Sequence, residues 1–414
     1  MLITLLRRLI GLSGIRASGA AFSLAMTLAI SHHLPMEESA KLLWIIAASA
    51  ICSVVSRGGL DKGYMKLGAS ASELVSPSDT LSAALIAYGG KLLLASVGLA
   101  SILFATGAIW LDGMEHPSDY LALAVGCSAV IAISICNFAG NVAIGAGSVA
   151  IGTAVIAFVA PFATFSLLVV SYVIEARPSF LLYTAIFAGG WFIAFGVLAT
   201  YVVPRLASTK HNQRTKILIP GVLGFAAIGI ANVIEQWAPT VVSGLVFDVE
   251  QAAYFAVASR IVSVVQIILI SATGAYAYQY ARASATEFPS VLRRSLLSLC
   301  SIGFPLVAGL IIFSDRIMTL FGQEYESGAG LLKILLAAQF FNVALGTCSV
   351  ALMMRGAVRQ VAVVFCVATI VQVGFSVAAA SAGSPELLAV GGLVSVALHT
   401  CLCALVLYRK MMRP

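Results

Sequence analysis

The stretch DVEQAAYFAVASRIVSVVQIILISATGAYAYQYAR, from Asp248 to Arg282, decides the fold of this chain. Within it, about 25 consecutive residues from Ala252 to Tyr276 are apolar or small. Roughly 20 such residues are enough to cross a bilayer as an α-helix. The stretch therefore predicts a transmembrane helix, and it indicates that the chain is an integral membrane protein.

Arg260 lies near the middle of this apolar run. A guanidinium at that depth costs about 2.5–3.5 kcal/mol on insertion scales, and such groups usually face a bundle interior or a water-filled cavity. Arginine does not lose its proton in proteins, so the position stays cationic. We expect Arg260 to bind an anion. The alternative is a buried partner, for which Glu235 on the preceding predicted helix is the candidate.

The composition agrees with a membrane protein. The 414 residues are 60% hydrophobic and only 10% charged, whereas soluble domains are about 25% charged. The net charge of +7 does not indicate a nucleic-acid partner. The basic residues are distributed among the predicted loops on one side of the membrane and are not clustered in a patch. The eight cysteines lie in or beside apolar segments, as small core residues do. No phosphate loop, metal-ligand cluster or nucleophile constellation is present, so we expect no cofactor, no metal and no catalytic residue.

The apolar runs predict twelve transmembrane helices. Their approximate ranges are 10–31, 41–56, 82–111, 121–141, 149–174, 179–203, 217–242, 251–276, 296–313, 329–352, 361–382 and 388–408. Arg7 and Arg8 before the first run resemble a signal peptide. Arg16 inside that run, and the lack of a small-x-small cleavage site, favour an uncleaved first helix.

The basic residues predict how the chain is oriented. With both termini cytoplasmic, 17 of the 24 basic residues fall in inside segments, and only Lys41, Arg177 and Arg316 fall outside. An excess of lysine and arginine on the cytoplasmic side is the usual determinant of orientation. We therefore predict an all-α, multi-pass protein with both termini in the cytoplasm.

The chain also repeats itself at about half its length. Segment 36–40 (MEESA) resembles segment 249–253 (VEQAA), and each precedes the second helix of a six-helix set. Internal repeats are common in transporters, with the substrate site between the repeats. The pattern predicts two six-helix lobes, 1–203 and 217–414, joined by a basic cytoplasmic linker, 204–216, around a central cavity.

Three stretches carry a resemblance to a known family. They are 250–261 (EQAAYFAVASRI), 321–325 (FGQEY) followed by 331–335 (LLKIL), and 57–61 (RGGLD). Together they resemble the polysaccharide (O-antigen-type) flippases of the multidrug/oligosaccharidyl-lipid/polysaccharide exporter superfamily, and the likeness in length and span number covers essentially the whole chain. One departure is the short loop 145–148, which lacks the basic residue expected there.

The resemblance implies a transporter and not an enzyme. It would flip a lipid-linked oligosaccharide, of the undecaprenyl diphosphate type, across the bacterial cytoplasmic (inner) membrane by alternating access. The pathway would be cell-surface polysaccharide biosynthesis, as for lipopolysaccharide O-antigen. Polysaccharide polymerases or glycosyltransferases would be its protein partners, membrane lipids would surround it, and no nucleic acid would be involved.

The ionisable residues inside the spans agree with an anionic substrate. They are four cations, Arg16, Lys91, Arg260 and Lys333, against one acid, Glu235. A cationic cavity suits a diphosphate, whose oxygens match the planar fork of arginine. The diphosphate-binding candidates are Arg260, Arg16, Lys91 and Arg57.

Each candidate has a simpler alternative. Arg16 and Lys91 can reach the inner interface by extending along their helices, and Lys333, near an outer end, is best interpreted that way. Arg57 lies at the cytoplasmic end of the second predicted span. It is either an ordinary basic residue of a cytoplasmic loop or a residue at the cytoplasmic entrance of the cavity.

Glu235 has two interpretations. It lies about as deep as Arg260, so the two can form an ion pair, which we favour, or Glu235 can be a protonatable residue that couples transport to an ion gradient. His399, alone in the last span, we interpret as a packing residue.

Two other classes of function remain. A cation/drug antiporter of the same superfamily shares the architecture but needs acids in its cavity, and the first lobe has no intramembrane acid. A membrane-embedded polysaccharide polymerase or glycosyltransferase generally needs a large outer loop or domain. Here the longest predicted outside loop is only about 15 residues, 314–328.

The charge distribution gives a direct test of topology. Reporter fusions or cysteine accessibility should place 204–216 and 282–294 in the cytoplasm and 314–328 outside, because the basic residues are retained inside. A reporter that finds 204–216 outside contradicts the two-lobe model.

Overall fold

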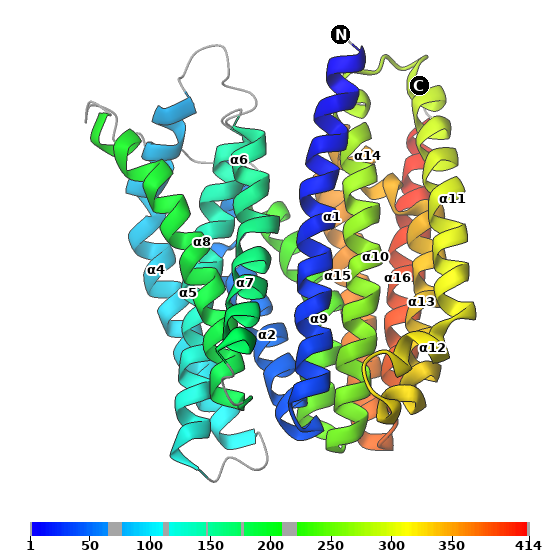
Figure 1. Cartoon of the computed structure of the whole chain (residues 1–414). Coiled ribbons are helices and arrows are strands. Elements are labelled where there is room, and N and C mark those ends of the chain that lie inside the picture. Colours follow the sequence, from blue (N-terminus) through cyan, green and yellow to red (C-terminus); the bar gives the residue numbers. More distant parts are fainter. Residues whose placement is uncertain are drawn as a thin grey trace. The chain divides into compact units, whose positions relative to one another are not determined.

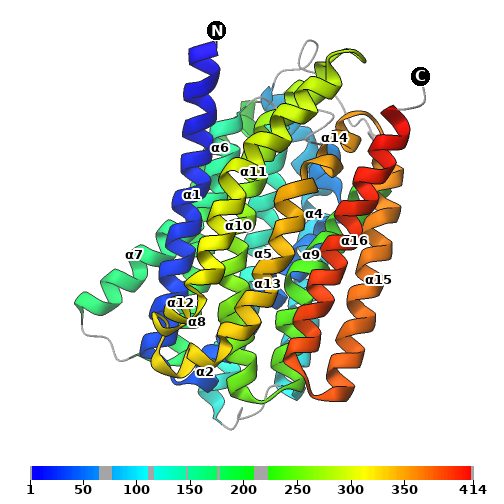
Figure 2. The same cartoon turned by 90° about the vertical axis from the view of Figure 1, so that its right-hand side faces the viewer.

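The computed structural model describes residues 2–64, 77–110, 116–145, 148–174, 178–208 and 222–411, and all regular structure there is helical (Figures 1 and 2). The helices are α1 (Leu2–His33), α2 (Met36–Arg57), α4 (Pro77–Trp110), α5 (Pro117–Gly145), α6 (Val149–Ala154), η1 (Val155–Val159), α7 (Ala160–Val173), α8 (Phe180–Ser208), α9 (Val222–Val246), α10 (Val249–Arg282), α11 (Phe288–Ile312), α12 (Ser314–Thr319), η2 (Gln323–Gly328), α13 (Ala329–Leu345), α14 (Thr347–Met354), α15 (Val358–Ala382) and α16 (Pro385–Met411).

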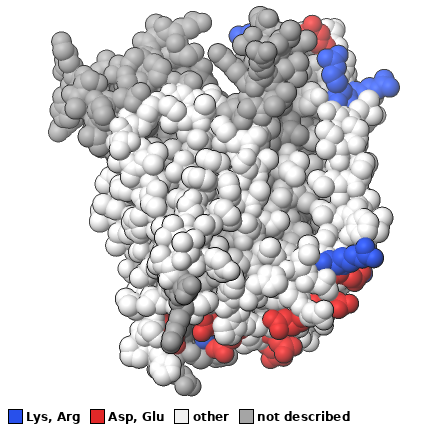
Figure 3. Space-filling model, in the orientation of Figure 1, with Lys and Arg blue, Asp and Glu red and all other residues white. Residues whose placement is uncertain are grey.

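The prediction of twelve spans is confirmed. Twelve helices of the described chain are long and apolar enough to cross a membrane. Large apolar side chains on these helices stay exposed, among them Leu94 (75%), Ile109 (75%) and Ile370 (71%). On the face in Figure 3, charged residues gather toward the two ends of the molecule. An exposed apolar surface of this extent is what lipid covers, so the chain is a multi-pass membrane protein.

The chain divides into two compact units. One is Gly14–Val233, and the other joins Met1–Ser13 to Ile234–Pro414. The division falls inside α9, whereas the sequence placed the lobe boundary at the linker 204–216. The reason is that the first turns of α9 pack on the first unit, where Ala226 lies directly against Gly59. Residues 209–216 of that linker and 146–147 of the short loop lie outside the described residues.

In the Gly14–Val233 unit, α5 is the central helix, and it packs against α2, α4 and α8. Its small residues allow this close approach. A Cβ atom at Gly126 would press on Ile45 of α2 and Thr184 of α8. Glycine at such a position lets three helices meet at one level of the membrane.

The fifth span carries a π-helical turn, Val155–Val159, between α6 and α7. Such single turns are often found at functional sites. Three rings of this span, Phe158, Phe162 and Phe165, surround Phe22 of α1 at centroid distances of 5.2–5.9 Å. One turn earlier in α1, Gly19 lies against the Ala157 carbonyl group. The first span therefore packs directly against the π-turn.

In the Ile234–Pro414 unit, α13 packs against α10, α11 and α16, and α15 packs against α16. A cluster of buried hydroxyl groups ties three of its helices together. The Tyr280 hydroxyl of α10 contacts Ser295 of α11, and it lies 2.7 Å from Thr347 Oγ1 of α14. Figures 1 and 2 place both chain termini at the same end, as an even number of spans requires.

The close contact between Gly19 of α1 and the π-turn predicts that adding one methyl group at Gly19 lowers stability. Gly19→Ala should lower the apparent melting temperature of the purified protein in detergent, because its Cβ would overlap the Ala157 carbonyl and overpacking typically costs about 1–3 kcal/mol. Gly14→Ala is the matched control on the same helix, since a Cβ there has no neighbour within 4 Å. Equal melting temperatures for the two variants would contradict this packing.

Candidate functional site

A buried carboxylate lies inside the Ile234–Pro414 unit. Glu235 of α9 accepts a hydrogen bond from Ser395 Oγ at 2.6 Å and lies 3.0 Å from Nδ1 of His399, both on α16. The side chains of His399 and Glu235 are only 9% and 7% exposed. The Ser395 hydroxyl also lies 3.0 Å from the carbonyl oxygen of Ala368 on α15. One carboxylate therefore links α9 to α16, and the serine extends the contact to α15.

The His399 ring has two described neighbours, one at its face and one at its Nδ1 atom. It stacks on Phe365 of α15 at a centroid distance of 4.6 Å, while its Nδ1 faces Glu235. A histidine can hold one or two protons, and a buried charge is costly unless it is paired. The contact with Glu235 therefore gives the buried ring a polar partner on α9.

Gln372 of α15 adds an amide near this pair. It is 1% exposed, and neither its Oε1 nor its Nε2 has a hydrogen-bond partner among the described residues. The amide faces α16 at Gly391 and Gly392. Leaving a buried polar group unsatisfied typically costs about 1–3 kcal/mol, so Gln372 is available to a polar ligand or to water.

Arg260 of α10 is half-buried and stacks on Trp237 of α9, with its Cζ 4.7 Å from the ring centroid. Its side chain makes no hydrogen bond or ion pair with any residue that the structure describes. The cation lies over the ring, and its N–H groups have no acceptor among the described residues. The stack therefore presents an uncompensated cation with open hydrogen-bond donors.

Glu235 and Arg260 do not form an ion pair within the described part of the chain, and Glu235 contacts His399 instead. The geometry of α9 gives the reason. Trp237 lies two residues after Glu235, which is about 200° around an α-helix. When Trp237 faces Arg260 on α10, Glu235 must face the opposite side, where α16 lies.

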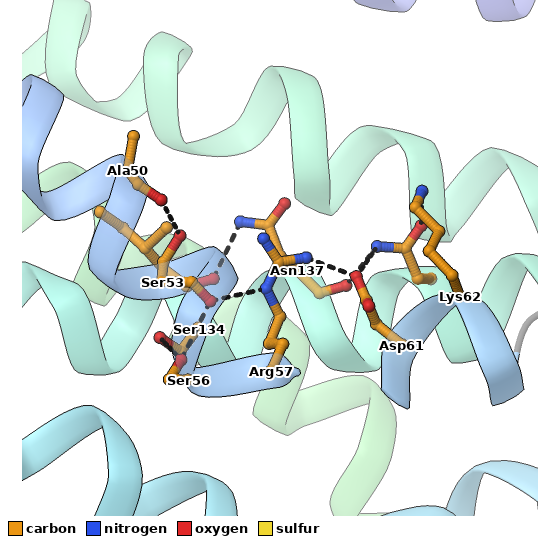
Figure 4. Close-up of polar contacts among 10 residues, drawn as sticks. Ala50, Ser53, Ser56, Arg57, Asp61, Lys62, Ser134 and Asn137 are labelled. Atoms are coloured by element: carbon orange, nitrogen blue, oxygen red, sulfur yellow. Dashed lines mark hydrogen bonds and ion pairs between the residues drawn. The ribbon is translucent and has the colours of Figure 1, made fainter. Parts of the chain in front are cut away.

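A second polar cluster lies in the Gly14–Val233 unit, at the end of α2 (Figure 4). Arg57 Nη1 donates to Asp61 Oδ2 at 2.5 Å, and both side chains are buried. Asn141 Nδ2 of α5 donates to the same oxygen at 3.0 Å, while its Oδ1 accepts from Lys62 Nζ at 3.1 Å. The cluster is thus a chain of four groups, in which Asp61 carries the only negative charge.

The backbone of this cluster is fixed by two glycines. Gly58 and Gly59 have φ angles of 49° and 73°, a left-handed conformation that other residues rarely adopt. The segment 60–64 that follows is helical and is anchored by Tyr64, whose ring packs against Phe138 and Tyr88. Burial and, to a smaller extent, the neighbouring Tyr88 raise the pKa of Tyr64 to about 12. The turn therefore holds Asp61 and Lys62 in defined positions.

Lys62 combines two properties. Its side chain is exposed, yet burial of the amine lowers its pKa, and Asp61 opposes this shift. The cations Arg57 and Arg16 lower the same pKa further, so Arg16 is close enough to act on Lys62. The residue as a whole is exposed, whereas its amine lies among protein atoms.

The other predicted cations differ in their surroundings. Arg16 is half-buried and makes no hydrogen bond or ion pair with the described residues. Lys91 is exposed and lies 5.6 Å from the centroid of the Tyr88 ring. It shares a helix face with Ile109, which is 18 residues (five turns) further along α4 and 75% exposed. Lys333 pairs with Asp315 at 3.1 Å on the surface.

Sequence reasoning missed His399, Asn141 and Lys62. His399 was interpreted as a packing residue because no partner for it is visible within its own span. Lys62 is one of the 17 basic residues that the topology places inside, and nothing in its sequence position separates it from the others. The sequence signal that indicates the second cluster is the pair of adjacent glycines, Gly58 and Gly59, shortly before Asp61. A Gly-Gly pair commonly marks a turn.

No protein family model matches the chain, and no curated protein matches it. Solved membrane transporters do match its fold over nearly the whole chain. A crystal structure of a MATE mutant matches with a TM-score of 0.68 at 12% identity, covering 98% of this chain and 95% of that chain. The lipid II flippase MurJ, in an inward closed conformation, matches with a TM-score of 0.66 at 13% identity, covering 97% and 89%.

A third structure is a MOP superfamily transporter from Pyrococcus furiosus, for which a reversed polarity of the binding pocket suggests a different function. It matches with a TM-score of 0.64 at 13% identity, covering 98% of this chain and 95% of that chain. At such identities the likeness shows the fold. The chain therefore shares its helical fold, with twelve candidate spans, with solved MATE and MOP superfamily transporters and with a lipid II flippase.

A double-mutant cycle distinguishes the partner of Glu235. Glu235→Gln and His399→Gln should be non-additive in apparent melting temperature, because contacting residues typically show coupling of about 0.5–3 kcal/mol. Glu235→Gln with Arg260→Gln should be additive, since no contact joins them in the described structure. Coupling to Arg260 and none to His399 would support the ion pair expected from the sequence.

Proposed function

We propose that this protein flips an anionic, lipid-diphosphate-linked saccharide across a membrane, and that Arg260 binds the diphosphate. The observation that carries the proposal is the guanidinium of Arg260, half-buried in a membrane span and without an anionic partner among the described residues. A permanent cation at such a depth is costly. A substrate that brings its own negative charge compensates that cost each time it binds.

The planar shape of the Arg260 guanidinium favours a phosphate group over a monatomic anion. With its Cζ over the Trp237 ring, the guanidinium offers a planar fork of N–H groups. Arginine and phosphate form two parallel hydrogen bonds in this geometry, which are about twice as strong as neutral ones. Within the Gly14–Val233 unit, Arg16 is also half-buried and has no described hydrogen-bond or ion-pair partner.

The saccharide part of the proposal rests on likeness. The three sequence stretches that resemble O-antigen-type flippases favour an oligosaccharide on undecaprenyl diphosphate, in cell-surface polysaccharide synthesis. The match to a lipid II flippase supports a lipid-linked substrate. Polysaccharide polymerases or glycosyltransferases are then the expected partners, and the bacterial cytoplasmic membrane is the expected location, with both termini in the cytoplasm.

Among the remaining candidates, Arg57 has the weakest support as a direct ligand, because Asp61 already matches its charge. We assign it the role of holding the turn after α2. Lys91, beside Tyr88 on an exposed apolar face, has its best role at the lipid interface.

A cation/drug antiporter is the second candidate, and the Glu235–His399 pair is the observation that favours it. A buried carboxylate can bind a cationic substrate or a coupling ion, and MATE transporters are among the matching structures. In a flippase, the same pair would instead couple the cycle to a proton gradient. The charge of the transported species separates the two functions.

Reconstituted protein tests Arg260 directly. In proteoliposomes, Arg260→Ala should abolish transbilayer movement of a fluorescent undecaprenyl diphosphate-linked saccharide, while Arg260→Lys should keep partial activity, because it retains the charge but loses the fork. Binding of the diphosphate lipid in detergent should weaken at least about tenfold in the alanine variant, since hydrogen bonds to charged groups contribute about 1.5–3 kcal/mol.

Lys333→Ala is the matched control, because this cation is paired with Asp315 on the surface. It should leave transport unchanged. Full flipping by Arg260→Ala at normal protein level would overturn the proposal, and uptake of a cationic dye that depends on Glu235 would favour the antiporter.

A further inference from the structure

A single arginine joins two turns of the Ile234–Pro414 unit. Arg355, which follows the last residue of α14, donates a hydrogen bond from Nη1 to the carbonyl oxygen of Ala283 at 3.0 Å. Ala283 ends α10, and Phe288 begins α11, with its ring centroid 4.9 Å from the Arg355 Cζ atom. The guanidinium therefore connects the α14–α15 turn to the α10–α11 turn. Both turns lie at the end of the unit that carries the chain termini (Figures 1 and 2).

No acid neutralises the charge of Arg355. It forms no ion pair with the described residues, and Glu287 is the one acid of the α10–α11 turn. The Glu287 Oε2 atom accepts from the backbone N–H and from the hydroxyl group of Ser284, at 3.1 and 2.8 Å. A guanidinium has five N–H donors. Since Ala283 accepts from one of them and Arg355 is exposed, donors remain for a further anion.

Three more arginines lie in the helices that follow these turns. Arg293 and Arg294 of α11 and Arg359 of α15 are exposed, and they make no hydrogen bond or ion pair with the part of the chain that the structure describes. Basic groups gather at the upper right of Figure 3, where Figure 1 shows the α10–α11 turn. We call these three residues and Arg355 the basic turn surface.

Exposed apolar residues continue from the basic turn surface along two helices. Leu297 of α11 is 60% exposed and lies four residues after Arg293, and Val363 of α15 is 58% exposed and lies four residues after Arg359. Residues four apart lie on the same helix face. Each helix therefore presents a cation followed by an apolar face that lipid covers.

We propose that the basic turn surface binds the headgroup of an anionic phospholipid, with Arg355 as the central ligand. The phosphate matches the guanidinium groups, and the acyl chains match the exposed apolar faces. Basic residues that lie between membrane helices near the bilayer surface commonly bind anionic headgroups. An acidic peptide or a free anion would match the charges but not the apolar faces. This lipid is distinct from the transported substrate, so the inference does not depend on the proposed function.

Short-chain lipids test the proposal on the purified full-length protein in dodecyl maltoside. The protein is titrated with dioctanoyl phosphatidylglycerol and with dioctanoyl phosphatidylcholine, which has the same chains and no net charge. The wild-type protein should bind phosphatidylglycerol at least about tenfold more tightly, because several arginines attract its net charge. The preference should fall as salt is added, since salt screens exposed charges.

Two variants separate charge from structure. The double variant Arg293→Gln/Arg294→Gln leaves the contacts of Arg355 in place and should weaken binding of phosphatidylglycerol by about 25-fold, at about fivefold for each arginine. Arg355→Gln should weaken it by about fivefold, and Arg355→Lys should recover part of that loss because it keeps the charge. Binding of phosphatidylcholine should change in none of them.

Arg316→Gln is the matched control, since it removes an exposed arginine of the same unit, in α12 at the opposite end (Figures 1 and 2). It should keep the full preference for phosphatidylglycerol. An equal loss in this control would show a general effect of net charge and would overturn the proposal.

Three other results would also overturn it. One is equal affinity of the wild-type protein for the two lipids, and another is an unchanged preference in both Arg293→Gln/Arg294→Gln and Arg355→Gln. The third is competition by inorganic phosphate at the same concentration as the lipid, which would indicate an anion site that does not use the acyl chains. Arg260→Ala should retain the preference, and its loss there would assign the lipid to the proposed substrate site instead.

Discussion

A charge inside the hydrocarbon of a bilayer has to be compensated, and this constraint explains how the polar residues of this protein are arranged. Water cannot solvate a buried ion there, and the cost of leaving it unpaired is several kcal/mol. In the part of the chain that the structure describes, Arg57, Glu235 and Arg260 lie against a counter-charge, a hydrogen-bonding partner or an aromatic face. Where this compensation is incomplete, as at Arg260, we propose that a ligand supplies the rest.

Three residues show three solutions. Arg57 is matched within its own turn by Asp61, four residues later. Glu235 is matched across the unit by His399, 164 residues later. Arg260 has only the face of Trp237, which offsets part of its cost, typically about 0.5–2 kcal/mol, and leaves its net charge. The first two charges are matched within the described structure, and the third is the one for which we propose an anionic ligand.

The sequence was sufficient to predict the twelve spans, because length and hydropathy alone determine whether a helix can cross a bilayer. It was not sufficient to predict contacts between spans. Depth in the membrane suggested Glu235 and Arg260 as partners, since both lie at similar distances from the outer ends of consecutive helices. Rotation about the helix axis decides the contact, and neither depth nor periodicity reports it for a helix that is apolar on most sides.

The π-turn of the fifth span also limits how this protein can change in evolution. A π-turn contains one more residue than the α-helical turn it replaces, so the helix before Val155 and the helix after Val159 are offset by about 100°. Deleting a single residue there would restore a regular α-helix and rotate one half against the other. Phe162 and Phe165 would then turn relative to the part of the span before Val155, and Phe22 of α1 would lose part of its aromatic contacts. The segment should therefore accept substitutions of similar size far more readily than a change in length.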